Sequence, residues 1–160
     1  LPFSIVLILC LLVASASAQG YEALSDASDI ARVVSQATSE VLVATDVLRS
    51  EEVAEALREA LVVRGVAVFI LAPRATSEEN ASYIAGLAYA GANVRLSDIG
   101  GSFLIVDRRY TVAGPLIGSL GELAGEAPTV VVDDPTYAAQ FVEGFRQSFE
   151  AAQAYTPIGR

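Results

Sequence analysis

Four residue types are missing from this sequence of 160 residues: histidine, lysine, methionine and tryptophan. Without histidine there is no imidazole to serve as general base, as phosphorus nucleophile or as metal ligand. Without lysine the chain cannot form a Schiff base and has no lysine for a phosphate-binding loop. These absences exclude most covalent and phosphate-binding chemistry, and we predict neither a cofactor nor a resident metal.

Cysteine and positive charge are also scarce. The single cysteine, Cys10, excludes a disulfide within the chain. Only 10 bases, all of them arginine, stand against 19 acids, and the net charge is −9. Because binding of nucleic acid usually needs a basic stripe, this balance argues against a nucleic-acid partner. An acidic surface of this kind keeps a domain soluble.

The first eighteen residues carry no charge. Ala16-Ser17-Ala18 matches the small-x-small rule of a secretory cleavage site, and the run approaches the length that spans a bilayer. We therefore expect residues 1–18 to be a signal peptide or a membrane anchor, with a buried helix of a soluble protein as the alternative. The acids that follow favour an extracytoplasmic domain, either membrane-anchored or secreted into the periplasm or medium. The membrane is an expected partner if residues 1–18 are retained.

After this segment we expect a polar linker over residues 19–28, one domain over 29–155 and a tail over 156–160. A hydrophobic content of 53% fits strands that are buried on both faces. Apolar spacing predicts helices over 29–37, 51–64, 77–90 and from 135 onward, and strands over 40–47, 66–71, 93–96, 102–107, 109–114 and 129–134. Strands that alternate with helices imply a parallel arrangement. The expected fold is α/β, with a mixed, largely parallel sheet flanked by helices and preceded by an N-terminal hydrophobic helix.

Local signals refine this outline. Strands 102–107 and 109–114 are separated by almost nothing, which predicts a hairpin with its turn at residues 107–109. Ser50 and Asp134 are expected to cap the helices that follow them. The spacing of Phe141, Phe145 and Phe149 predicts that all three face the core.

The order of four stretches resembles one repeat of the phospholipase D superfamily. They are "EVLVATDVLRSEEVAEALREALVVRGVAVFIL", "NASYIAGLAYAGANVRL", "GGSFLIVDRRYTVAG" and "APTVVVDDPTYAAQFVEGFRQSFEAA". The resemblance covers roughly residues 26–153. It implies an active-site hairpin at the third stretch, and a closing strand and aromatic-striped helix at the fourth.

The resemblance also implies where catalytic residues would stand. Members of the superfamily carry His-x-Lys-x4-Asp and, after six further residues, Gly-Ser and then Asn. Their histidine attacks phosphorus, while the lysine, serine and asparagine hold the phosphate oxygens. The matching positions here are Gly100 for His, Ser102 for Lys, Asp107 for Asp, Gly114 for Gly, Pro115 for Ser and Ile117 for Asn. The motif is degenerate, and we predict no catalytic residue.

The retained Asp107 has two interpretations. It is expected to cap the hairpin turn or to pair with Arg108 or Arg109. The alternative is a residual role in binding a ligand. A separate motif, Asn80-Ala81-Ser82, matches the acceptor sequence for N-glycosylation.

Three functions follow from these observations. The first is a catalytically inactive, extracytoplasmic phospholipase D-like domain. It would act as an accessory subunit for assembly or binding in a membrane or envelope complex. Single-repeat members of the superfamily pair through the face that holds their active sites, which implies a homo-oligomer. The second is a divergent phosphodiester hydrolase, a phospholipase or nuclease. It would use Asp107 with Ser102 or an arginine, and a metal recruited by Asp133 and Asp134. The third is a module that binds a lipid or small ligand in the emptied pocket.

Overall fold

The computed structural model describes residues 20–98, 101–118 and 127–157. Residues 1–18, predicted to be a signal peptide or anchor, lie outside the described residues. None of the helices in the described ranges is long and apolar enough to cross a membrane.

Eight strands form one sheet in the order β1-β7-β6-β5-β2-β3-β4-β8. The strands are β1 (Tyr21–Leu24), β2 (Glu40–Ala44), β3 (Ala67–Ala72), β4 (Asn93–Leu96), β5 (Phe103–Val106), β6 (Tyr110–Ala113), β7 (Thr129–Asp133) and β8 (Gln153–Ala154). Only the β2–β3 and β3–β4 pairings are parallel, and the other five within the described residues are antiparallel.

The expectation of a largely parallel sheet is therefore wrong, although the sheet is mixed and flanked by helices as predicted. The crossovers do make β2, β3 and β4 parallel. However, β5 pairs antiparallel with β2, and the short hairpin turn forces β6 to reverse again. Strands β7 and β1 continue this antiparallel half.

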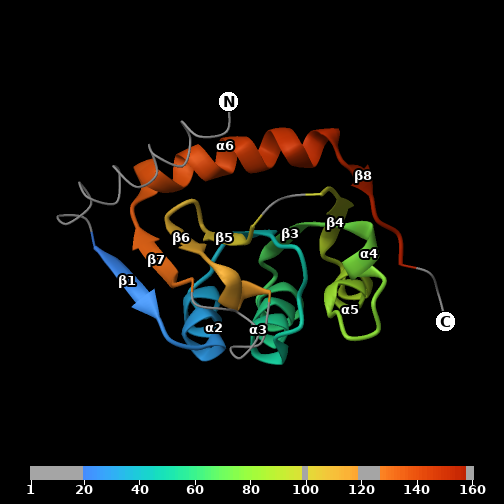
Figure 1. Ribbon diagram of the computed structural model, residues 1–160, viewed down its shortest axis with the longest axis horizontal. Helices are drawn as coiled ribbons and strands as arrows, with labels where there is room; N and C mark the ends of the chain where they lie inside the picture. The colour runs from blue at the N-terminus through green and yellow to red at the C-terminus, as the bar shows by residue number, and fades with distance from the viewer. Residues whose placement is uncertain (1–19, 99–100, 119–126, 158–160) are drawn as a thin grey trace.

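Helices cover the two faces of the sheet unequally. Figure 1 shows α6 (Pro135–Ala151) across one face, with α2 (Ala27–Ser35), α3 (Glu51–Val62) and α5 (Ile84–Ala90) on the other. Strand β2 contacts both layers because successive side chains point to opposite faces. Val41 and Val43 join the core under α2, α3 and α5, whereas Leu42 and Ala44 join the core under α6.

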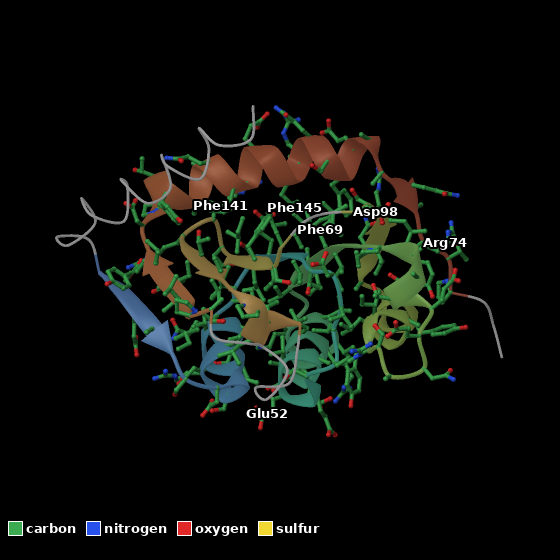
Figure 2. The ribbon with its side chains drawn as sticks, in the orientation of Figure 1. Glu52, Phe69, Arg74, Asp98, Phe141 and Phe145 are labelled. Carbon is green, nitrogen blue, oxygen red and sulfur yellow. The ribbon has the colours of Figure 1, made fainter. Side chains whose placement is uncertain are left out.

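The helix signals in the sequence are confirmed where a cap marks them. The Ser50 hydroxyl accepts a hydrogen bond from the Val53 amide at the start of α3. Asp134 caps α6, with Pro135 as its first residue. In the core under α6, Phe145 and Phe149 are buried and their rings stack with centroids 5.5 Å apart. Figure 2 shows Phe141 and Phe145 pointing from α6 toward the sheet.

Two predicted segments differ from the structure. The expected linker over residues 19–28 instead contains β1, which pairs with β7, and the beginning of α2. The expected helix over residues 77–90 is divided into α4 (Arg74–Ser77) and α5. The helix is interrupted because the Tyr83 amide donates to the Leu48 carbonyl, 2.9 Å away, instead of to a carbonyl within a helix.

Candidate functional site

The motif positions lie at two opposite edges of the sheet. Strand β5 runs antiparallel to β2, so Ser102 lies at the carboxyl end of β2 and Asp107 at its amino end. Five residue steps along an extended strand separate Ser102 from Asp107, a span of about 16 Å. Gly114 follows β6 and lies at the same edge as Ser102, since the Gly114 amide donates to the Ser102 carbonyl at 3.0 Å.

At its own edge, Asp107 binds the chain just before β2. One carboxylate oxygen accepts hydrogen bonds from the amide and hydroxyl of Thr38, at 2.8 and 2.9 Å. The other accepts from the amide and hydroxyl of Ser39, both at 2.9 Å, and from the Glu40 amide at 3.0 Å. In return, the Asp107 amide donates to the Glu40 carbonyl at 3.0 Å. The carboxylate therefore joins the hairpin turn to the start of β2.

These bonds lower the pKa of Asp107. Burial by itself raises the pKa, but the amides of Glu40, Ser39 and Thr38 donate to the ionised form and outweigh that effect. The pKa falls from 3.8 to about 2. The group is ionised at neutral pH, and both of its oxygens accept hydrogen bonds from the protein.

The two arginines of the turn pair with other acids. Arg108 donates to Glu40 at 2.6 Å, and Arg109 makes a two-pronged contact with Asp133 at 2.5 and 2.9 Å. Asp107 was expected to cap the hairpin turn or to pair with Arg108 or Arg109, but its carboxylate binds residues 38–40 instead. Asp107 and Arg108 have φ values of 50° and 56°, the left-handed geometry of a tight hairpin turn.

At the opposite edge, Ser102, which stands in the lysine position of the motif, is hydrogen-bonded to Thr45. The hydroxyls of Ser102 and Thr45 are 3.0 Å apart, and Thr45 donates to the Val47 carbonyl at 2.6 Å. Thr45 is fully buried. Because the proton of Thr45 goes to Val47, Ser102 must be the donor in the first bond. Ser102 thus serves as a hydrogen-bond donor to Thr45 within the protein.

The positions of the two polar phosphate ligands belong to the core of the domain. Pro115 begins a short 3-10 helix, Pro115–Ile117, and Ile117 is fully buried. Gly114 has a φ of 140°, and a Cβ there would collide with Thr129. The Thr129 hydroxyl in turn accepts a hydrogen bond from the Leu116 amide at 3.1 Å. An apolar turn therefore fills the place where the superfamily pattern has serine and asparagine.

Gly100, in the position of the attacking histidine, lies outside the described residues. The carboxylates considered for metal binding are used elsewhere: Asp133 pairs with Arg109, and Asp134 accepts from the Thr136 and Tyr137 amides at 2.7 and 3.2 Å. Over residues 20–98, 101–118 and 127–157, no group of three or more His, Cys, Asp or Glu could hold a metal ion.

Every arginine in the described part of the chain has an acidic or carbonyl partner. Seven form ion pairs: Arg32, Arg49, Arg58, Arg74, Arg108, Arg109 and Arg146. Arg64 donates to the carbonyls that end α2, and Arg95 donates to the carbonyls that end α6. The positive charge is therefore neutralised locally.

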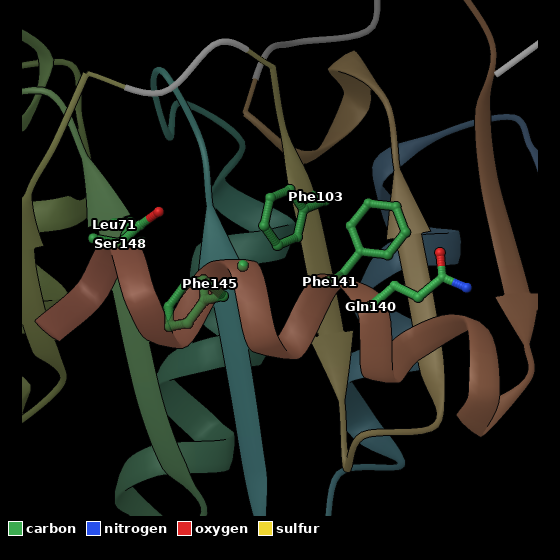
Figure 3. A pocket seen from close by; sticks show the side chains of 7 residues that line it. Leu71, Phe103, Gln140, Phe141, Phe145 and Ser148 are labelled. Atoms are coloured by element: carbon green, nitrogen blue, oxygen red, sulfur yellow. The ribbon is translucent and has the colours of Figure 1, made fainter. Parts of the chain in front are cut away.

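A groove of about 340 Å³ runs between α6 and the sheet. It is mostly apolar and is lined by Leu71, Phe103, Gln140, Phe141, Gly144, Phe145 and Ser148. Figure 3 shows Phe103 on β5 and Phe141 and Phe145 on α6 around it. The groove is formed by α6 together with β3, which contributes Leu71, and β5, which contributes Phe103.

The side chains that bind Asp107 and Ser102 at the two edges were not predicted from the sequence. Thr38 and Ser39 bind Asp107 across a separation of 69 and 68 residues. Gly118 packs so closely against Val47 and Thr45 that a Cβ would overlap them. A hydroxyl pair directly before a buried strand was the available signal for the first contact, but nothing local connects that pair with Asp107.

We expect Asp107→Asn to destabilise the fold by about 2 kcal/mol at pH 7. The side-chain NH₂ of asparagine would face the donating groups of residues 38–40 and cannot accept their hydrogen bonds, and the negative charge is lost. The pKa of Asp107 is lower in the folded state than its ordinary 3.8. Its contribution is therefore complete above about pH 4 and is lost as the pH falls toward 2. Urea unfolding of both proteins between pH 7 and 2 measures the difference, and a difference that stays constant over this range contradicts the assignment.

Comparison with known proteins identifies the fold. No protein-family model matches the sequence, and no curated protein does. Nuc from Salmonella typhimurium, a phospholipase D family member, is 20% identical with a TM-score of 0.67, and the match covers 85% of this chain and 95% of Nuc. NucT from Helicobacter pylori is 16% identical with a TM-score of 0.67, covering 86% of this chain and 98% of NucT.

A third match is to a longer protein. TrmBL2, described as an archaeal chromatin protein with a novel mode of DNA binding, is 21% identical with a TM-score of 0.63. The match covers 95% of this chain but 60% of TrmBL2, so the present sequence corresponds to part of that protein. Together with Nuc and NucT, the sheet and its hairpin show that this chain has the fold of the phospholipase D superfamily.

Proposed function

We propose that this protein is a catalytically inactive phospholipase D-like domain that acts as an assembly or binding subunit on the extracytoplasmic side of a membrane. The observation that carries the proposal is that residues at the motif positions make contacts within the protein. Asp107 binds the main chain before β2, Ser102 binds Thr45, and Ile117 is buried in the core. None of these groups is directed at a common point where a phosphate could bind.

The divergent hydrolase is less well supported. It needs Asp107 to act with Ser102 or with an arginine. Ser102 lies about 16 Å from Asp107 along β5, well beyond hydrogen-bond reach. The neighbouring Arg108 and Arg109 are paired with Glu40 and Asp133. Asp133 and Asp134, the acids considered for a recruited metal, are held by Arg109 and by the amino end of α6. A phosphodiester near Asp107 would meet its carboxylate beside arginines that are already paired with Glu40 and Asp133.

We also propose that nucleic acid is not the partner. TrmBL2 binds DNA, but that property belongs to a larger protein. Phosphate contacts need arginines whose charge is available. Here the described arginines are paired with acids or helix carbonyls on a chain with a net charge of −9. A protein partner agrees better than nucleic acid with these paired arginines, and a second copy of the chain is the simplest such partner.

The extracytoplasmic location is supported by the charge-free residues 1–18 and by the acids that follow them. A subunit in this location would be attached to the membrane through residues 1–18 if they are retained. It would otherwise be released as a secreted or periplasmic domain. In both cases the globular domain itself would make the contacts with the partner.

We expect the purified protein to sediment as a homodimer and to hydrolyse bis(p-nitrophenyl) phosphate no faster than buffer does. The reason for the second result is that neither a nucleophile nor a cation stands at the phosphate positions. The assay is run with EDTA and with Mg²⁺, Mn²⁺, Ca²⁺ or Zn²⁺ in turn. Asp133→Asn serves as a control for a recruited metal, and Asp107→Asn as a control for the retained motif residue.

Turnover that disappears in folded Asp107→Asn, or that needs a metal and is lost in Asp133→Asn, would contradict the inactive assignment. Turnover that persists equally in both variants points to a contaminating phosphodiesterase. Sedimentation as a monomer without a co-purifying partner would contradict the proposed role in assembly.

The groove beside α6 favours one second candidate, a module that binds a lipid chain or another apolar ligand. Its volume of about 340 Å³ lies within the usual range of ligand sites, and Leu71, Phe103, Phe141 and Phe145 supply an apolar lining. Gln140 and Ser148 offer polar atoms at the same groove. None of the described motif positions, Ser102, Asp107, Gly114, Pro115 and Ile117, is among the residues that line this groove.

We expect Gly144→Leu to reduce binding of a fluorescent fatty acid at least tenfold if the groove is a ligand site. A Cβ at Gly144 meets no atom within 4 Å, so the added side chain can occupy the groove without disturbing α6. Gly86→Leu is the matched control, because Gly86 lies in a helix with equally open space and is not among the groove residues. Equal binding by both variants would exclude the groove as the ligand site.

A further inference from the structure

We propose that Asn80 is a site of N-linked glycosylation. Asn80-Ala81-Ser82 satisfies the acceptor rule, because the middle residue is not proline and the third carries a hydroxyl. The other asparagine of the chain, Asn93, is followed by Val94 and Arg95 and does not satisfy the rule. The inference rests on the extracytoplasmic location proposed above, since glycosyl transfer to asparagine takes place on exported chains.

The local structure presents this motif to solvent. Asn80 and Ala81 form an exposed turn in the connection between α4 and α5. Figure 1 shows these two helices at the end of the molecule opposite β1. A carbohydrate attached at an exposed turn needs no rearrangement of the core, in contrast to one attached within a strand or beneath a helix.

The hydrogen bonds of Ser82 are local to the turn. The Ser82 amide donates to the Glu79 carbonyl at 3.0 Å, and the Ser82 hydroxyl accepts a long bond of 3.4 Å from the Ile84 amide. These are contacts of a single turn between neighbours in sequence. Asn93, by comparison, is the first residue of β4 and is paired with Phe69 of β3. The two asparagines therefore differ in local structure, since Asn80 lies in an exposed turn and Asn93 lies in the sheet.

The turn is also connected to the edge of the sheet that contains Ser102. Arg49 pairs with Glu79 at 2.6 Å, and the Tyr83 amide donates to the Leu48 carbonyl. The same loop, residues 45–50, binds Ser102 through Thr45. A carbohydrate on Asn80 would stand next to this loop and would keep a large partner from packing flat against the turn. Assembly would then use a different part of the surface.

The test is peptide mass spectrometry on the protein isolated from cells that produce it, after cleavage at arginine. Residues 75–95 form one peptide, because no arginine lies between Arg74 and Arg95, and it contains both asparagines. We expect this peptide to carry a carbohydrate mass that fragmentation assigns to Asn80 and not to Asn93. Asn80→Gln and Ser82→Ala should each remove the mass, while Ser82→Thr should retain it.

Protease accessibility on intact cells separates this inference from the location on which it rests. An unmodified peptide from protein that external protease can digest would overturn the glycosylation while leaving the location standing. An unmodified peptide from protein that stays protected after any outer membrane has been permeabilised, and that is absent from the medium, would overturn both. A carbohydrate mass that survives Ser82→Ala would also contradict the proposal, because modification would then not follow the acceptor rule.

Discussion

The carboxylate of Asp107 holds together two parts of the chain that lie almost seventy residues apart in sequence. Its five hydrogen bonds attach the β5–β6 turn to the residues that lead into β2. Strands β5 and β2 then pair antiparallel, and this pairing joins the parallel half of the sheet to the antiparallel half. Both cores depend on that junction, because β2 contributes side chains to each of them.

This contact gives a physical reason why an aspartate can stand alone in an otherwise empty motif. Asp107 lies at the edge of the sheet opposite Ser102 and Gly114, where its carboxylate binds backbone amides. These contacts do not involve the other edge. Positions that would have contacted phosphate are free to take other residues, and Ile117 contributes to packing instead.

Much of the fold could be predicted from the sequence, because local signals specify it. Ser50, Asp134 and Pro135 mark helix starts, and the short connection at residues 107–109 requires a hairpin. The direction of most strand pairings could not be predicted, because it depends on the antiparallel pairing of β5 with β2 and no local signal specifies that pairing. Strand β1 was missed because its exposed residues carry no apolar alternation, and only pairing with β7 makes it a strand. The positions that match the superfamily motif could be assigned from the sequence. The partners of Asp107 and Ser102, which are Thr38, Ser39 and Thr45, could not, because only tertiary contacts bring them together.

The central claim is that Asp107 acts as an ionised structural anchor, and its own titration tests that claim most directly. The chemical shift of the Asp107 carboxyl carbon, followed by NMR as the folded protein is acidified, reports its protonation. The bonds to Thr38, Ser39 and Glu40 predict a midpoint at about 2, with the group still ionised at pH 3. A midpoint close to the ordinary 3.8 would show that the carboxylate is not held by those amides, and the account built on it would fail.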